Sequence, residues 1–334
     1  QLATGTETVT ITDDGSGLDW IVLLGTYLTA TDINLNWTYS GAASDGTATS
    51  GQGFYFSPSN IGHRLVVNGL IENARGSNGA DYIQGNSAAN ILFGDHDATG
   101  PGLADTLSGG YGNDTIYGGA GSDTIGGGHS NDLLHGNAGA DTISGGDGAD
   151  TLFGGAGADS LSGGSDGTDW VSYLTSSAAV DVRLISGDTS LSYGGDAQGD
   201  RIYGINNVRG SDFGDKITDR PESNAYNANH FEGMGGADQL RMGAGNDTAY
   251  GGEGLDSIYG ESGNDQLFGG DGSDSVLGGD GRDLVIGGDG YNFLDGGAGA
   301  DTVRGGDLRD RLYGGAEADM MLGDGGDDLF FGGL

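Results

Sequence analysis

Aspartate residues recur every nine positions over long stretches of this chain, and their type and spacing could do chemistry. Each stands sixth in a nonapeptide that reads Gly-Gly-x-Gly-x-Asp-x-apolar-x, as in GGYGNDTIY at 109–117 and GGAGSDTIG at 118–126. The pattern returns at 145–153, 154–162, 269–277, 278–286 and 296–304. An aspartate held at one phase of a glycine turn presents carboxylate oxygens, the ligands that hard divalent cations prefer.

The residues at this sixth position, called the phase residues below, form two series that we expect to bind metal. The first series, within about 76–171, is Asp81, Asn90, Asp105, Asp114, Asp123, Asp132, Asp141, Asp150, Asp159 and Asp169. The second, within about 210–334, is Asp215, Asn229, Asp238, Asp247, Asp256, Asp265, Asp274, Asp283, Asn292, Asp301, Asp310, Asp319 and Asp328. The three asparagines keep an oxygen but lose the charge, so we expect weaker sites there.

Glycine turns and short strands must position these aspartates. Glycine tolerates positive φ and lets backbone carbonyls face a cation. The three residues after each aspartate are predicted strands, whose middle residue points inward and whose outer two point outward. The inward residues are apolar: Ile116, Ile125, Leu134, Ile143, Leu152, Leu161, Ile258, Leu267, Val276, Val285, Leu294, Val303 and Leu312. A short exact period of this kind predicts an all-β stacked solenoid in place of a globular core.

Stacking such turns places carboxylates close together. Parallel strands lie about 4.8 Å apart, and carboxylates at that spacing repel by roughly 3–4 kcal/mol per pair at an effective dielectric constant near 20. The stack is therefore unfavourable without a divalent ion, and Ca²⁺ suits the irregular oxygen geometry of a loop. We expect metal binding and folding to be coupled.

The nonapeptide resembles the RTX (repeats-in-toxin) family of calcium-binding proteins. The resemblance implies a right-handed parallel β-roll with two nonapeptides per coil, multiple Ca²⁺ ions between turns 18 residues apart, and ligands from phase aspartates and turn carbonyls. It also implies export in an unfolded form and folding outside the cell. Carried over to this chain, the rows are Asp114, Asp132 and Asp150; Asp123, Asp141 and Asp159; Asp247, Asp265, Asp283, Asp301 and Asp319; and Asp238, Asp256, Asp274, Asn292, Asp310 and Asp328.

The chain contains an internal duplication. A Trp-containing strand at 19–21 (DWI) has its counterpart at 169–171 (DWV), and IENARGS at 71–77 matches INNVRGS at 205–211. We therefore predict an N-terminal β segment or cap at 1–75, a first calcium-binding β-roll at 76–171, an inter-roll β segment at 172–209 and a second calcium-binding β-roll at 210–334, so that irregular β segments join two rolls.

Composition limits the classes of partner. The 334 residues carry 49 acidic and 12 basic side chains, for a net charge of −37, which disfavours nucleic acid and anionic membrane surfaces. The chain has 74 glycines without a Gly-X-Y triplet and no cysteine, so collagen, disulfides and thiolate metal sites are excluded. No apolar run reaches the length of a membrane span, and the N-terminal residues are not a signal peptide. We expect a secreted protein, extracellular or on a bacterial cell surface.

Catalytic signals are weak, and we predict that the chain is not an enzyme. Gly163–Gly167 matches the Gly-x-Ser-x-Gly elbow but lies in a repeat turn, and the histidines form no zinc motif. His96 stands with Asp95 and Asp97 in an insertion, where a solvated loop is favoured over an extra metal site.

Outward-facing apolar residues predict an interface near the C-terminal end. Leu284, Ile286, Met320 and Leu322 share one face, and Leu329 and Phe331 occupy the other. These residues favour self-association, or binding to another extracellular surface protein, in a surface layer, filament, matrix or adhesin. The alternative is the non-catalytic part of a larger secreted enzyme or toxin.

A weaker alternative is an ice- or glycan-binding module. The flat face with Thr124, Thr142 and Ser160 would order water for ice binding. A glycan would bind in the variable segments 30–64 and 186–197, by stacking on aromatic side chains. The candidate aromatics are Trp37, Tyr39, Phe54 and Phe56, for which packing as a cap is favoured.

Overall fold

The computed structural model describes residues 73–76, 79–95, 102–165, 168–184, 191–219 and 228–333, and describes four further strands in 20–66 by their backbone alone. The chain divides into two compact units, Gln1–Asp169 and Trp170–Leu334. The boundary of the units falls beside the end of the first repeat series. The predicted division into four parts stays a prediction.

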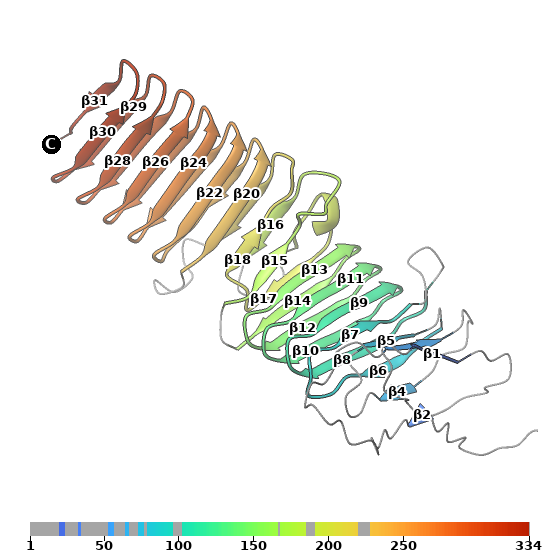
Figure 1. Ribbon diagram of the computed structural model, residues 1–334. Coiled ribbons are helices and arrows are strands. Elements are labelled where there is room, and N and C mark those ends of the chain that lie inside the picture. Colours follow the sequence, from blue (N-terminus) through green and yellow to red (C-terminus); the bar gives the residue numbers. More distant parts are fainter. Residues whose placement is uncertain are drawn as a thin grey trace, which may run out of the picture. The chain divides into compact units, whose positions relative to one another are not determined.

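Two parallel sheets form the first unit, and successive strands along the chain alternate between them. One sheet contains β1 (Trp20–Leu23), β3 (Gly53–Phe56), β5 (Asn73–Arg75), β7 (Ile91–Phe93), β9 (Thr115–Ala120), β11 (Leu133–Ala138) and β13 (Thr151–Ala156). The other contains β2 (Ile33–Asn34), β4 (Arg64–Val66), β6 (Tyr82–Gln84), β8 (Thr106–Tyr111), β10 (Thr124–His129), β12 (Thr142–Asp147) and β14 (Ser160–Gly164). Figure 1 shows the strands of this unit stacked side by side.

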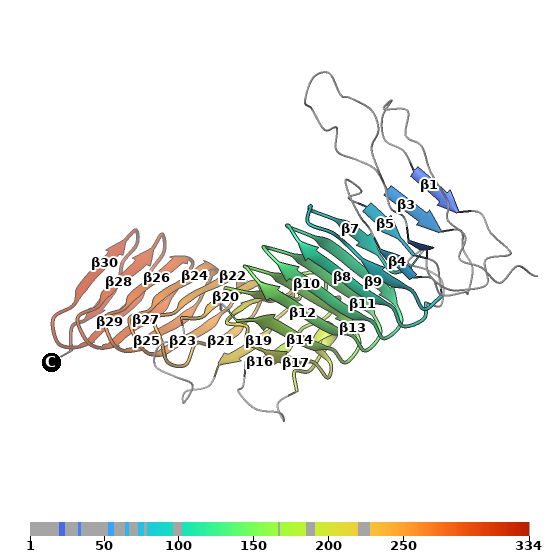
Figure 2. The same ribbon diagram turned by 90° about the horizontal axis from the view of Figure 1, so that it is seen from below.

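The second unit repeats this arrangement. One sheet contains β15 (Trp170–Ser172), β18 (Asn207–Arg209), β20 (His230–Gly236), β22 (Thr248–Gly254), β24 (Gln266–Gly272), β26 (Leu284–Asp289), β28 (Thr302–Gly306) and β30 (Met320–Asp324). The other contains β16 (Asp181–Leu184), β19 (Lys216–Asp219), β21 (Gln239–Arg241), β23 (Ser257–Ser262), β25 (Ser275–Asp280), β27 (Phe293–Ala298), β29 (Arg311–Ala316) and β31 (Leu329–Phe331). Figure 2 shows these two sheets as separate layers.

The predicted all-β parallel solenoid is confirmed. Every inter-strand pair along these sheets runs parallel, and strands in regular repeats pair with residues 18 positions away, as Leu134 does with Leu152. Each coil therefore holds two nonapeptides. The connections are consistent with the right-handed roll expected for parallel strands. The remaining described elements are β17 (Arg201–Tyr203) and one short 3₁₀ turn, η1 (Gly195–Ala197). In the described part of the chain, no helix is long and apolar enough to cross a membrane.

The predicted inward column forms the core. All thirteen of these apolar side chains are at most 1 % exposed, so the interior of each coil is a single row of aliphatic residues. The outward neighbours alternate as expected: Thr115 and Tyr117 face one side, and Thr124 and Gly126 the other. Such a core is thin, and its burial stabilises each coil by only about 1.5–3 kcal/mol per fully buried aliphatic side chain.

The strands are longer than predicted. Three-residue strands were expected, but most regular strands continue through the glycines of the next nonapeptide. In β10 and β12 the pairing passes over Gly127 and Gly145 and resumes at Gly128 with Gly146. Gly128 has a φ of 118°, a left-handed value that glycine adopts without strain. Each glycine turn thus pairs with the turn of the next coil in the same sheet, but the first glycine of the nonapeptide is not part of this pairing.

Candidate metal centre

The phase aspartates lie inside the roll and not on its surface. Asp114 is 1 % exposed and Asp132 is 3 % exposed. The backbone N–H of Asp114 donates to Oδ1 of Asp132 at 2.8 Å, and the N–H of Asp132 donates to Oδ1 of Asp150 at 2.8 Å. The same bond joins the members of all four rows implied by the family resemblance, with Asn292 included in its row. The structure therefore places these side chains in rows along the turns.

The second carboxylate oxygen has a different environment. In the regular turns Oδ2 is buried and has no hydrogen-bond partner, although a buried polar atom is normally bonded. The aspartates whose Oδ2 is in this state are Asp105, Asp114, Asp123, Asp132, Asp141, Asp238, Asp247, Asp256, Asp265, Asp274, Asp283, Asp301, Asp310 and Asp319. A row of buried carboxylate oxygens that no hydrogen-bond donor reaches is suited to hold cations.

Each Oδ2 shares its space with a turn carbonyl. A Cβ added to Gly127 would clash with Oδ2 of Asp132 and with the carbonyl oxygen of Gly145, one coil further on. The same relation holds at Gly269, with Asp274 Oδ2 and the Gly287 carbonyl. We call this space, between the first glycine, the phase carboxylate and the carbonyl 18 residues later, the cradle. Its donors are all oxygen atoms, which fits Ca²⁺ and gives thiolate-preferring metals no ligand.

Burial makes these carboxylates costly to ionise without a metal. It raises the pKa of Asp105 to about 8, that of Asp132 to about 7 and that of Asp265 to about 8. The backbone hydrogen bond to Oδ1 lowers these pKa values, and neighbouring carboxylates raise them again. At neutral pH the metal-free rows are therefore only partly ionised, and a divalent cation would favour the fully ionised form.

The comparison with protein families agrees with this geometry. The family model for the RTX calcium-binding nonapeptide repeat matches residues 68–97, 102–134, 127–161, 135–171, 227–248, 242–276, 277–312 and 304–334. Because these matches cover more than half of the sequence, the chain belongs to the RTX calcium-binding nonapeptide repeat family. It binds multiple Ca²⁺ ions, as the family's repeats do. No curated protein matches the chain.

Several predicted ligands have surroundings unlike the regular turns. Both oxygens of Asp215 accept hydrogen bonds from Ser211. The Asn229 amide donates to Asp219 and to a backbone carbonyl. Asn292 accepts from the N–H of Asp274 at 2.9 Å, so its Nδ2 points where an oxygen would be.

The role of each phase residue as a ligand stays a prediction. Ser211 and Asp219 were not singled out from the sequence. The sequence feature that could have identified Ser211 is a serine where most nonapeptides have their second glycine.

Asp95 gives the turn before the insertion an extra carboxylate. It stands where most repeats have their second glycine, and its Oδ2 accepts the N–H of Ala120 at 2.6 Å. Its charge also raises the pKa of Asp105 and of Asp123. Asp95 thus bonds to the backbone of the next coil. His96 and Asp97 lie outside the described residues.

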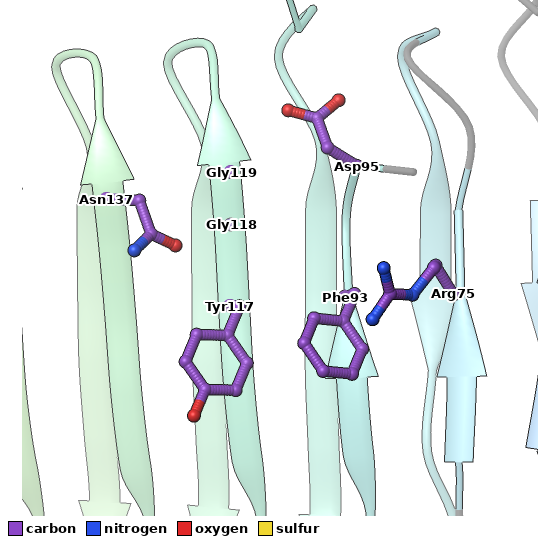
Figure 3. Close-up of a pocket in the computed structure, with 7 residues that line it drawn as sticks. All are labelled: Arg75, Phe93, Asp95, Tyr117, Gly118, Gly119 and Asn137. Carbon is purple, nitrogen blue, oxygen red and sulfur yellow. The ribbon is translucent and has the colours of Figure 1, made fainter. Parts of the chain in front are cut away.

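An aromatic row runs along one outward face of the first unit. Phe93 and Tyr117 stack with their centroids 5.0 Å apart, His135 follows at 4.6 Å, and Phe153 at 4.5 Å. The Arg75 guanidinium lies 4.0 Å above the Phe93 ring. A hollow of about 260 Å³ lies beside this row, lined also by Asp95, Gly118, Gly119 and Asn137, as Figure 3 shows. Tyr117 and His135 have both ring faces covered by their neighbours, and Phe93 is covered by Tyr117 and Arg75.

This arrangement gives no support to glycan stacking on the row, because a sugar packs on an open ring face. The aromatics first considered for a glycan are Trp37, Tyr39, Phe54 and Phe56. Trp37 and Tyr39 lie outside the described residues, and the structure describes Phe54 and Phe56 by backbone only. Glycan binding stays a prediction.

Proposed function

We propose that the chain is an extracellular structural module whose rolls become rigid on binding calcium and then associate through an apolar face. Calcium binding and the solenoid follow from the family and the fold, and RTX repeat proteins are typically secreted. The solenoid is a structural repeat domain. Assembly in a layer, filament, matrix or adhesin is the proposed role.

The observation that carries this proposal is an apolar surface on the second unit. Met320 is 55 % exposed, Leu322 46 % and Tyr250 41 %. They share one face with the half-buried Phe268, Leu284 and Ile286, because β22, β24, β26, β28 and β30 are neighbours in one sheet. An Arg304–Asp324 ion pair lies between the apolar groups of this face. We call these six apolar residues the apolar face.

A second cluster lies on the opposite sheet. Phe331 is 44 % exposed, and its ring stacks on Tyr313 with centroids 4.4 Å apart. Leu329 precedes it in β31 and is half-buried. Contiguous exposed apolar groups of this kind are typical of protein–protein contacts. The net charge of −37 opposes association of two copies, so calcium neutralisation would promote it.

Light scattering and electron microscopy during a calcium titration test the assembly role. We expect particles that grow once the rolls have folded, and a loss of growth in a Met320→Ser, Leu322→Ser double variant. Leu255→Ser is the matched control, because Leu255 is 64 % exposed but lies in a turn outside the apolar face. A wild-type chain that folds with calcium yet stays a monomer would contradict self-assembly and favour the alternative, a non-catalytic part of a larger secreted enzyme or toxin.

A further inference from the structure

The first rungs of the second roll differ from all the regular ones. A rung here means one phase residue with the turn that surrounds it. From Asp238 to Asp319, the phase aspartates leave one buried oxygen without a hydrogen-bond partner, as Asp247 and Asp256 do. The two preceding phase residues, Asp215 and Asn229, are also buried, at 2 % and 3 % exposed, but their side chains bond within the chain: the Asp215 carboxylate accepts from Ser211, and the Asn229 amide donates to Asp219.

At Asp215 the donors come mainly from Ser211. The Ser211 hydroxyl donates to Oδ1 at 2.8 Å, its backbone N–H donates to Oδ2, and the N–H of Val180 donates to Oδ1 at 2.8 Å. Ser211 is completely buried. Oδ2 of Asp215 still lies beside Gly210 and the carbonyl of Gly233, so the cradle is built as in other rungs. What differs is that N–H and O–H groups point at the carboxylate.

The backbone explains why Ser211 donates. Ser211 takes the second position of its nonapeptide, and its φ is not in the left-handed region. In the following turns that position has a φ of 79° at Met234, 111° at Gly252 and 110° at Gly270. A serine in ordinary backbone conformation can bond an acidic side chain four residues later through both its hydroxyl and its N–H, as turn-forming residues do.

At Asn229 an amide group takes the place of the carboxylate. Its Nδ2 donates to Oδ2 of Asp219 at 2.7 Å and to the carbonyl oxygen of Met242 at 3.0 Å. Asp219 stands where a regular turn has its first glycine, and Met242 supplies the carbonyl of the next coil. Both neighbours are acceptors, so the NH₂ group must face them. Two N–H donors therefore occupy the cradle that oxygen atoms and a cation occupy elsewhere.

An early turn of the first unit, around Asn90, has similar hydrogen bonds within the chain. Asn90 is 1 % exposed, and its Oδ1 accepts the N–H of Asn86 at 2.8 Å. Asn86 holds the second position of its turn, as Ser211 does, and its φ is likewise outside the left-handed region. The first described rung of this unit with an unpartnered Oδ2 is Asp105. The duplicated sequence thus repeats the same change from self-satisfied to cation-requiring rungs.

Packing around the opening coils of the second unit also needs no metal. The Trp170 ring lies 4.9 Å from that of His230 and 5.1 Å from the Arg209 guanidinium, and Arg209 pairs with Glu232 at 2.5 Å. The Tyr173 hydroxyl donates to the fully buried Asp200 at 2.9 Å. The ring contact, the Arg209 contact and the ion pair join β15, β18 and β20 through protein groups alone.

We propose that the Asp215 and Asn229 rungs hold hydrogen-bond donors in place of calcium, and that they form a metal-independent platform on which the calcium-dependent coils stack. The proposal rests on calcium binding by the regular rungs. It assigns Ser211, Asp219 and Asn229 as the residues that decide where the calcium row begins. Stacking on a folded coil avoids the cost of starting a parallel sheet from an unfolded chain.

Hydrogen exchange followed by mass spectrometry, on the full chain in a calcium chelator, tests the platform. We expect amides of 207–219 and 228–236 to exchange at least about tenfold slower than those of 257–316, since local stability differences appear as protection. With calcium, both regions should be protected. Equal, fast exchange in the chelator would overturn the proposal, and calcium uptake by the other rungs would still leave the proposed function standing.

Two aspartate substitutions sharpen this test. Asn229→Asp replaces the donors with a carboxylate facing Asp219 and the Met242 carbonyl, so we expect loss of the metal-free protection and one more bound Ca²⁺ in native mass spectrometry. Asn292→Asp is the matched control, because it restores an aspartate inside the roll and should leave metal-free protection at 207–219 unchanged. If both variants alter the metal-free exchange alike, or neither does, the proposal fails.

Discussion

At the scale of single residues, the two oxygens of one aspartate have separate tasks. Oδ1 of Asp265 accepts the N–H of Asp247 at 2.8 Å, which fixes the side chain against the preceding coil. Oδ2 is buried without a hydrogen-bond partner beside Gly260 and the Gly278 carbonyl. The first oxygen thus orients the second toward the cradle. A substitution can therefore remove the charge of this side chain while keeping the hydrogen bond that positions it.

Asp265→Asn tests this division. The amide oxygen can keep the bond to Asp247, but an NH₂ group replaces the oxygen in the cradle and one negative charge is lost. We expect the calcium midpoint of folding to rise about tenfold, equivalent to about 1.4 kcal/mol. The control Asp289→Asn removes the same charge from the exposed end of β26 and should leave the midpoint within about twofold. Equal effects of the two variants would show that only net charge matters.

At the scale of elements, the turn requires glycine for the space it leaves and not only for its φ. In most regular turns the first glycine of the nonapeptide faces the phase carboxylate and the next coil's carbonyl, as Gly127 and Gly269 do. The residue before it points outward from the strand and has room for any side chain. Gly126 and Gly127, which are adjacent in β10, therefore form a matched pair: an added Cβ clashes at Gly127 and meets nothing at Gly126.

Gly127→Ala should disrupt the Asp132 rung, because its Cβ would overlap Asp132 Oδ2 and the Gly145 carbonyl. We expect a loss of about 1–3 kcal/mol in the calcium-bound state, as for overpacked sites. Gly126→Ala meets nothing within 4 Å and should be neutral or slightly stabilising. Chemical denaturation at saturating calcium measures both. Equal tolerance of the two alanines would contradict the cradle.

The sequence predicted the elements well where the period is exact and poorly where the backbone departs from it. The inward column and the 18-residue rows follow from strand alternation and the nonapeptide, and residues such as Leu134 and Asp132 lie where expected. The extension of strands through Gly128 was missed because it depends on φ. The Ser211–Asp215 bonds and the Asn229–Asp219 pair depend on contacts between different turns, which spacing alone does not encode.

At the scale of the whole molecule, the rolls are an array of buried acids. Their folded pKa values of about 6 to 8, raised chiefly by burial, lie above the unfolded value near 3.9. The metal-free folded state therefore binds more protons than the unfolded chain, and its stability falls as the pH rises from about 4 to about 8. Calcium requires the deprotonated form, so protons and calcium compete.

This competition predicts opposite pH dependences with and without metal. In a chelator, lowering the pH from 8 to 5.5 should increase the β-sheet signal in circular dichroism. With calcium, the same change should raise the midpoint of calcium-induced folding by about tenfold or more, since several coupled aspartates become protonated. A midpoint that is equal at pH 5.5 and pH 8 would show that these carboxylates do not bind the ion.

Circular dichroism during a calcium titration at pH 7.5, starting in chelator, tests the coupling of folding to calcium most directly. The account predicts a mostly unordered spectrum without metal, a cooperative gain of β structure with Ca²⁺, reversal by chelator, and little response to Mg²⁺, which accepts irregular oxygen sites poorly. A full β spectrum in chelator, unchanged by calcium, would contradict the claim that the aspartate rows need the ion to fold.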